Sequence, residues 1–315
     1  MVPPEDKDAG LSRRDFLKAG AAAGAFALIA AAVPEVAWGA GAAAVDPSRL
    51  GELVNPWDVA FGPAGELYVA NAGRYGVVRL TGAERSYIGR GAGTAPGQLN
   101  FPMGLDVAAR DGSLYVADTN NGRIVVFDPA GEYASDFGRP GYLDGEFLRP
   151  KSVCCFRDGV LVADTRNHRV QYIDLAGQRL VTKEPATRAI LGGLGEGPGD
   201  LKLPRYVACD ADGLIYVADG GLARVTVYAL DGRIVRTPGV GAFAEPAGVV
   251  VAPDGTTYVA DAGAAKVLAF YKNGRLASDA LPGLKGLQKP RGLALWEDWL
   301  ACADPAAARV FITRV

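Results

Sequence analysis

The chain has 315 residues and a nearly balanced charge, with 33 lysines and arginines against 35 aspartates and glutamates. With this balance the protein has no overall positive electrostatic field that would attract nucleic acid or an anionic membrane, so we expect neither as a partner. The 42 glycines and 20 prolines recur between short apolar runs. That distribution is typical of turns between short strands and predicts an all-β fold.

We expect residues 1–41 to form an export signal that is separate from the fold. Residues 12–18 read SRRDFLK, and an alanine-rich apolar run follows them. A short positive region, an apolar core and small residues at 40–42 are typical of a secretory signal. The apolar run is shorter and less apolar than a membrane-spanning helix requires. The pair Arg13 and Arg14 resembles the twin-arginine signal. This resemblance implies export in a folded state to the periplasm or beyond, with membrane contact through the signal alone.

The rest of the chain contains six copies of a short strand that ends in Asp or Asn. The last residues of the copies are Asn71, Asp118, Asp164, Asp219, Asp261 and Asp304. The copies are 42 to 55 residues apart, a spacing typical of repeats with four short strands. A proline precedes each copy, at Pro56, Pro102, Pro150, Pro204, Pro246 and Pro290. Because proline cannot donate a ladder bond, we place it at the start of each first strand.

Four-stranded sheets that pack face to face are propeller blades, so we predict a six-bladed β-propeller over residues 42–315. The blades begin near residues 55, 101, 149, 203, 245 and 289. The chain end at Phe311–Val315 supplies a third strand to blade 6. We therefore expect a strand around Ala40–Val45 to close the ring by completing that blade.

Blade 2 contains YVADTNNGR after a Pro-Met-Gly-Leu segment, and this pattern resembles the NHL repeat. The similarity extends from about Asn55 to the C-terminus. It assigns a turn motif to Asp118, Asn121, Arg123, Asp164, Asn167, Arg169, Asp219, Arg224, Asp261, Lys266, Asp304 and Arg309. Blades 4 to 6 lack the middle Asn, so we expect their turns to be held differently. The resemblance implies a six-bladed propeller of NHL-type blades, a kind that commonly serves as an interaction platform.

We interpret the repeated Asp and Arg as scaffold chemistry. An Asp at the end of a strand can accept backbone N–H bonds across a turn, and an Arg five residues later can add a charge-assisted bond. The alternative is a ring of aspartates that binds metal. An arginine near each carboxylate disfavours that alternative.

The four cysteines are Cys154, Cys155, Cys209 and Cys302, and His168 is the single histidine. This composition disfavours a Cys/His zinc site, and we predict no catalytic or metal-binding residue. His168 is expected to be an exposed turn residue, since no nucleophile motif accompanies it. We expect buried thiols, because folding before export would enclose them. One pairing, Cys154 with Cys209, is geometrically possible between neighbouring strands.

The position after each repeat proline should face the mouth of the central channel. The mouth residues predicted to bind a ligand are Trp57, Asp58, Met103, Lys151, Ser152, Arg205, Tyr206 and Arg291, with Ala247 completing the ring. Three cations beside Trp and Tyr are suited to an anionic or sugar-like ligand. The alternative is that these cations are simply solvated loop residues.

The sequence leaves two classes of function open. The first is a monomeric, non-catalytic binding or scaffold protein of the cell envelope, whose partner is a protein, a glycan or a small anion. The second is a metal-dependent hydrolase similar to propeller lactonases, with a carboxylate- and Asn-bound divalent ion in the channel. Asp58 is the acidic residue placed at the mouth, so we expect a binding protein and predict no cofactor.

Overall fold

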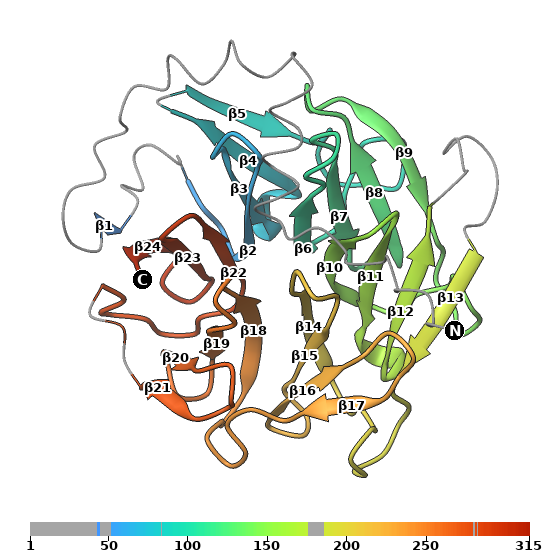
Figure 1. Ribbon diagram of the computed structural model, residues 1–315. Coiled ribbons are helices and arrows are strands. Elements are labelled where there is room, and N and C mark those ends of the chain that lie inside the picture. Colours follow the sequence, from blue (N-terminus) through green and yellow to red (C-terminus); the bar gives the residue numbers. More distant parts are fainter. Residues whose placement is uncertain (1–42, 45–51, 83, 176–185, 280, 282) are drawn as a thin grey trace, which may run out of the picture. The chain divides into compact units, whose positions relative to one another are not determined.

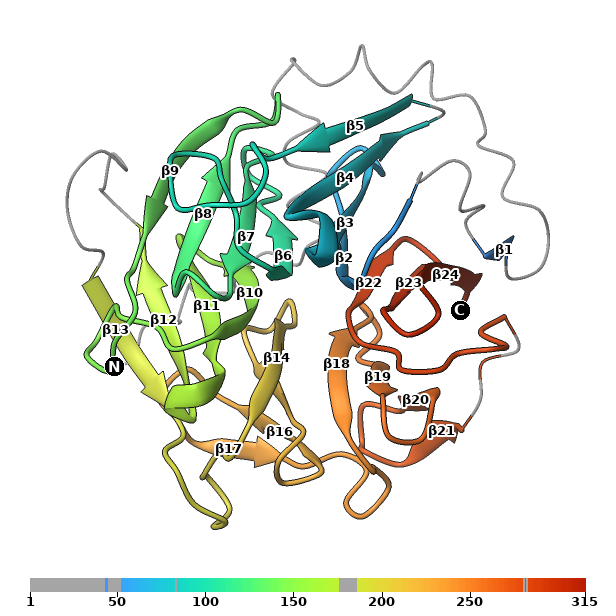
Figure 2. The same ribbon diagram turned by 180° about the vertical axis from the view of Figure 1, so that it is seen from behind.

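The computed structural model describes residues 43–44, 52–82, 84–175, 186–279, 281 and 283–315. These residues form six four-stranded antiparallel sheets, which confirms the predicted all-β, six-bladed propeller. Figure 1 shows the sheets around a common centre, with the first strand of each sheet innermost, and Figure 2 shows the same arrangement from behind. The whole of the predicted export signal, residues 1–41, lies outside the described ranges. Within them, no helix is long and apolar enough to cross a membrane.

Each blade contains consecutive strands, except that blade 6 takes its outer strand from the other end of the chain. Blade 1 contains β2 (Pro56–Phe61), β3 (Leu67–Asn71), β4 (Gly76–Thr81) and β5 (Glu84–Ile88). Blade 2 contains β6 (Pro102–Val107), β7 (Leu114–Asp118), β8 (Arg123–Phe127) and β9 (Tyr133–Phe137). Blade 3 contains β10 (Pro150–Phe156), β11 (Gly159–Asp164), β12 (Arg169–Asp174) and β13 (Ala186–Leu191). Blade 4 contains β14 (Pro204–Cys209), β15 (Ile215–Asp219), β16 (Arg224–Tyr228) and β17 (Ile234–Arg236). Blade 5 contains β18 (Pro246–Val251), β19 (Thr257–Asp261), β20 (Lys266–Phe270) and β21 (Leu276–Ser278). Blade 6 contains β22 (Leu293–Trp296), β23 (Trp299–Asp304), β24 (Arg309–Arg314) and β1 (Ala43–Ala44). Two short 3-10 helices, η1 (Ala72–Arg74) and η2 (Thr165–Asn167), lie in the turns of blades 1 and 3.

The core consists of apolar layers between neighbouring blades. All five residues of β7 are buried, because both faces of this strand are covered. Val116 and Val125 pack toward blade 1, whereas Tyr115 and Ile124 pack toward blade 3. The alternation follows from the two-residue period of a strand. Each blade is therefore stabilised mainly by its two neighbours.

Blade 6 is closed by a strand from the N-terminal side of the fold. Ala43 pairs with Ile312 and Ala44 pairs with Phe311, both antiparallel. The sheet order is β1-β24-β23-β22, so the two ends of the propeller share one sheet. The pairing of β1 with β24 therefore closes the ring within blade 6.

An irregularity after the repeat proline aims the next side chain toward the channel. In blade 1, Pro56 pairs with Asn71 and Asp58 pairs with Ala70, which leaves Trp57 outside the ladder. The same register shift follows the first proline of β6, β10, β14 and β18. A bulge of this kind bends the strand locally and re-aims a side chain. It explains why the residues after the prolines gather at one site.

Candidate binding site at the channel mouth

A pocket of about 270 Å³, counting its open end, lies at the centre of the ring. Its walls come from all six blades and consist of Trp57, Asp58, Met103, Lys151, Arg205, Tyr206, Ala247, Arg291 and Gly292. The structure thus brings together every residue predicted at the mouth except Ser152. Because this volume includes open solvent, the enclosed part of the pocket is small.

Ser152 lies beneath the mouth and does not line the pocket. Its side chain is fully buried, and its Oγ accepts a hydrogen bond from the Val207 N–H at 3.2 Å. This bond joins the inner strands of blades 3 and 4. The expectation that Ser152 belongs to the binding surface is therefore corrected: its short side chain is occupied by the neighbouring strand.

Asp58 and Tyr206 form the floor of the pocket. The Tyr206 hydroxyl donates to Asp58 Oδ1 at 2.8 Å, and the Leu105 N–H donates to Asp58 Oδ2 at 3.0 Å. The Val59 N–H also donates to Oδ1, at 2.9 Å. Burial raises the pKa of Asp58 well above its usual value, and burial together with Asp58 raises the pKa of Tyr206. The floor is consequently a hydrogen-bonded unit in which both Asp58 oxygens already accept hydrogen bonds.

Glycine at position 292 makes room for this floor. A Cβ at Gly292 would lie 1.9 Å from Asp58 Oδ1 and 2.5 Å from Asp58 Cα. In addition, the Gly292 N–H donates to the Trp57 carbonyl at 3.0 Å. The close approach of blades 6 and 1 therefore needs a residue without a side chain.

Three cations surround the pocket, and two of them share one carboxylate. Glu245 Oε1 is 2.8 Å from Arg205 Nη2 and 3.3 Å from Arg291 Nη1. The Arg291 guanidinium and the Lys151 ammonium lie 5.0 Å and 5.9 Å from the Trp57 ring centroid, within cation–π range. Across the described ranges, Lys151 makes no ion pair. The mouth thus carries an excess of positive charge.

The same excess of positive charge lowers the pKa values of the cations. Burial, and then the positive charges of Arg205 and Arg291, lower the pKa of Lys151 from 10.5 to about 8. Burial and Arg205 also lower the pKa of Arg291, although Glu245 opposes the shift. A nearby anion would favour the charged form of each group.

Two buried donors at the mouth have no hydrogen-bond partner in the described part of the chain. They are Trp57 Nε1 and Arg205 Nε. Arg205 Nε lies against Gly220, where a Cβ would be 2.2 Å away, so packing explains its isolation. Trp57 Nε1 belongs to a residue that lines the pocket.

Sequence reasoning did not find Glu245, the counter-ion of Arg205 and Arg291. It is the residue before the repeat proline of blade 5, one position ahead of the predicted mouth set. The equivalent position carries no acid in the other blades, so the repeat pattern gave no signal for it.

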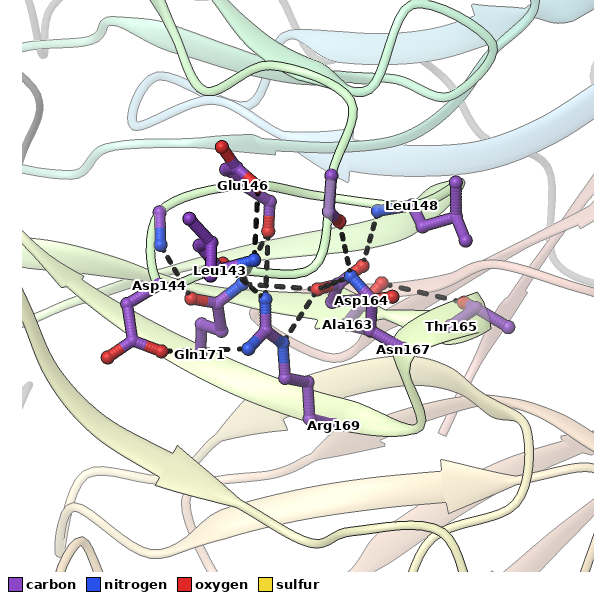
Figure 3. A network of polar contacts seen from close by, with 12 residues as sticks. Leu143, Asp144, Glu146, Leu148, Ala163, Asp164, Thr165, Asn167, Arg169 and Gln171 are labelled. Atoms are coloured by element: carbon purple, nitrogen blue, oxygen red, sulfur yellow. Dashed lines mark hydrogen bonds and ion pairs between the residues drawn. The ribbon is translucent and has the colours of Figure 1, made fainter.

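The Asp turn motif fastens the loops that carry the mouth residues. In blade 3, Asp164 accepts bonds from the Leu148 N–H at 2.7 Å, from Arg169 Nε at 2.9 Å and from the side chains of Asn167 and Gln171 (Figure 3). Blade 2 has the corresponding bonds from Asn100, Asn121 and Arg123 to Asp118. Burial raises the pKa of both carboxyl groups, although the hydrogen bonds from these donors lower it. These residues are scaffold and lie outside the pocket lining.

Blades 4 to 6 hold the same carboxylate with backbone N–H groups. Asp261 accepts bonds from Ala244, Glu245, Gly263 and Ala264 at 2.7–3.1 Å. Asp219 and Asp304 have the same arrangement. The expected arginine partner is absent among the described contacts of these three carboxylates. Arg224 instead donates to the Gly197 and Asp200 carbonyls, and Lys266 and Arg309 form no ion pair in the described structure.

Neither His168 nor an acidic cluster adds a second site. His168 is half-buried, at the end of η2 with φ 57°, and its Nδ1 contacts the Lys202 carbonyl oxygen. It therefore differs from the exposed residue expected there. No group of three His, Cys, Asp or Glu side chains suited to a metal occurs in the described ranges. The oxygens of Asp58 are already engaged by three donors.

Comparisons with known proteins agree with the repeat and the signal. The NHL repeat family matches residues 99–127, and the twin-arginine translocation pathway signal matches residues 10–30. The chain is 32% identical over 145 residues to Protein brain tumor of Drosophila melanogaster, covering 45% of this chain and 13% of that protein. It is 28% identical over 198 residues to Protein SUPPRESSOR OF QUENCHING 1, chloroplastic, of Arabidopsis thaliana, covering 53% of this chain and 18% of that protein. The chain therefore spans less than a fifth of the length of these curated relatives.

Solved structures share the fold at low identity. A protein of unknown function from Bacteroides thetaiotaomicron matches with a TM-score of 0.62 and 15% identity, covering 88% of this chain and 72% of that one. Virginiamycin B lyase from Staphylococcus aureus matches with a TM-score of 0.58 and 12% identity, covering 80% and 78%. These identities show a common architecture and assign no activity.

Proposed function

We propose that this NHL-repeat propeller, exported by the twin-arginine route, is a non-catalytic binding protein that captures an anionic group of its partner at the channel mouth. The group is a carboxylate or a phosphate. The match to an NHL repeat supports a binding role, because propellers of this repeat type commonly serve as interaction platforms. The site itself supports the choice of an anion.

The observation that carries the proposal is the uncompensated charge of Lys151. Its ammonium lies in a shared pocket with Arg205 and Arg291, whereas the Glu245 carboxylate forms ion pairs with the two arginines. A half-buried charge without an ion-pair partner costs free energy, and the pKa of Lys151 is lowered accordingly. A bound anion would supply the missing counter-charge.

The remaining lining favours recognition of one small group. Guanidinium groups bind carboxylate and phosphate through directed N–H bonds, and the Trp57 indole N–H adds a further donor. Met103 and Tyr206 are 5% and 9% exposed and give the pocket a largely closed wall. The enclosed space is small, so the rest of a larger partner stays outside the ring.

The hydroxyl and carboxyl groups at the floor do not form a catalytic arrangement. Asp58 accepts bonds from Leu105, Val59 and Tyr206, which leaves neither oxygen in the position of a free general base. The Ser152 hydroxyl is held by Val207. This geometry supports binding over nucleophilic hydrolysis.

The test is a thermal-shift screen of the mature protein with monocarboxylates, sugar acids, inorganic phosphate and phosphorylated sugars. An anion at a hundredfold excess over its Kd should raise the Tm by roughly 5 °C or more. Lys151→Ala combined with Arg205→Ala should abolish this shift. The matched control is Arg275→Ala with Lys285→Ala, which removes two exposed cations elsewhere and should leave the shift intact. Equal loss in both variants, or retention in the pocket variant, would contradict the proposal.

A further inference from the structure

Three of the four cysteines gather where the inner strands of blades 3 and 4 meet. Cys154 on β10 and Cys209 on β14 have their sulfur atoms 3.4 Å apart, and both lie within 3.7 Å of the Cys155 carbonyl oxygen. All of them are free thiols here. The fourth, Cys302, is buried in blade 6.

The strand register explains why these two sulfur atoms meet. The Ser152 Oγ and the Val207 N–H fix β10 against β14. Cys154 lies two residues after Ser152 on β10, and Cys209 lies two residues after Val207 on β14. Residues two positions apart on a strand point to the same face. The contact is therefore built into the packing of two neighbouring blades.

We propose that Cys154 and Cys209 are a covalent modification site that forms a disulfide between blades 3 and 4 after export. The oxidant is the disulfide of a thiol–disulfide exchange partner in the exported compartment. A disulfide has an S–S length of about 2.0 Å, so the sulfur atoms need to approach by little more than an ångström. Folding before export therefore positions the pair for oxidation.

The exchange proceeds in two steps. Cys209 is partly exposed whereas Cys154 is buried, so the Cys209 thiolate attacks one sulfur of the oxidant. This forms a mixed disulfide and releases the first oxidant thiolate, which takes up a proton. Cys154 then loses its proton and attacks the Cys209 sulfur, which displaces the second oxidant thiolate. Two protein thiols are oxidised and the oxidant disulfide is reduced to two thiols.

Two observations favour this order of attack. The hydrogen bond to Cys209, and then burial, raise the pKa of the Cys154 thiol, which disfavours its thiolate as the first nucleophile. Once the mixed disulfide is formed, the short sulfur contact makes the second attack intramolecular.

The bond would join segments that are far apart in sequence. It would close a loop of 55 positions between β10 and β14, and it would stabilise the fold chiefly by restricting the unfolded chain. Lys151 and Arg205 are the second residues of the same two strands, so the bond would also fix the spacing of two cations at the mouth.

The test is the thiol count of the protein purified from the exported fraction without reductant. After denaturation and reaction with N-ethylmaleimide, the intact mass should show two labelled thiols, and four after reduction. Peptide mapping should show Cys154 linked to Cys209. Four labelled thiols after incubation with oxidised glutathione, or a link that involves Cys155, would overturn the proposal.

Two variants make the result specific. Cys302→Ala should keep the bond and lose one labelled thiol, whereas Cys209→Ala should show three labelled thiols. Reduction should lower the Tm of the wild type by roughly 5 °C or more and leave that of Cys209→Ala unchanged. Cys209→Ala should still respond to an anion at the mouth, so this proposal and the anion proposal can fail separately.

Discussion

The Tyr206 hydroxyl donates a 2.8 Å hydrogen bond to Asp58 Oδ1 from the opposite side of the ring. Tyr206 belongs to blade 4 and Asp58 to blade 1, and these blades face each other in a ring of six. The bond therefore crosses the central channel directly beneath the mouth. It turns the entrance into a pocket with a floor, and it ties together strands that share no sheet.

We predict that Tyr206→Phe lowers the free energy of unfolding by about 1–2 kcal/mol, because Asp58 loses one of three donors in a buried position. The measurement is urea denaturation of the mature protein. Tyr258→Phe is the matched control, since that tyrosine is also buried but its hydroxyl makes no hydrogen bond in the described structure. Equal effects of the two substitutions would show that the bond across the channel contributes nothing specific.

Lys151→Met should stabilise the unliganded protein while removing anion binding. The charged amine is disfavoured by burial and by two arginines, so an apolar side chain of similar length relieves an existing cost. With allowance for its remaining solvent contact, we expect a gain of about 1 kcal/mol at pH 7. Denaturant titration measures the gain, and loss of stability on this substitution would indicate that Lys151 is a structural residue.

Lys151 should also give the protein a specific pH dependence. Its pKa is lowered in the folded state, so the unfolded chain binds more protons between about pH 8 and pH 10.5. Across that window the stability of the wild type should rise relative to Lys151→Met, and the gap between the two should close. Anion affinity should fall across the same range, because the ammonium is lost.

Parallel unfolding curves and calorimetric titrations from pH 7 to pH 10.5 would check both trends. A constant gap between wild type and Lys151→Met would contradict the assignment of the titration to this amine.

The two kinds of Asp turn should respond differently to loss of their basic residue. Arg169→Ala removes a donor from fully buried Asp164 and should cost about 3 kcal/mol. Arg309→Ala should change stability by less than about 0.5 kcal/mol, because Asp304 is held by backbone N–H groups. Thermal denaturation of the two variants checks this, and similar losses would refute the distinction.

The repeat spacing was sufficient to predict the fold, because each blade buries the same strand on both faces. Most of the residues predicted after the prolines line the central pocket, since the bulge after each proline is a local consequence of the repeat. The details that depend on single residues were not predictable. Glu245 occurs in one blade, and the side chain of Ser152 is occupied by the neighbouring strand. The missing Asn predicted that the turns of blades 4 to 6 differ, but their backbone donors leave no signature of their own in the sequence.

A crystal structure of the exported protein with the strongest anion from the screen tests the central claim most directly. We predict electron density for the anion inside the pocket, in contact with Lys151 and with Arg205 or Arg291, and with the bond between Tyr206 and Asp58 intact below it. An anion bound elsewhere, with the pocket unchanged and Lys151 still unpaired, would contradict the account.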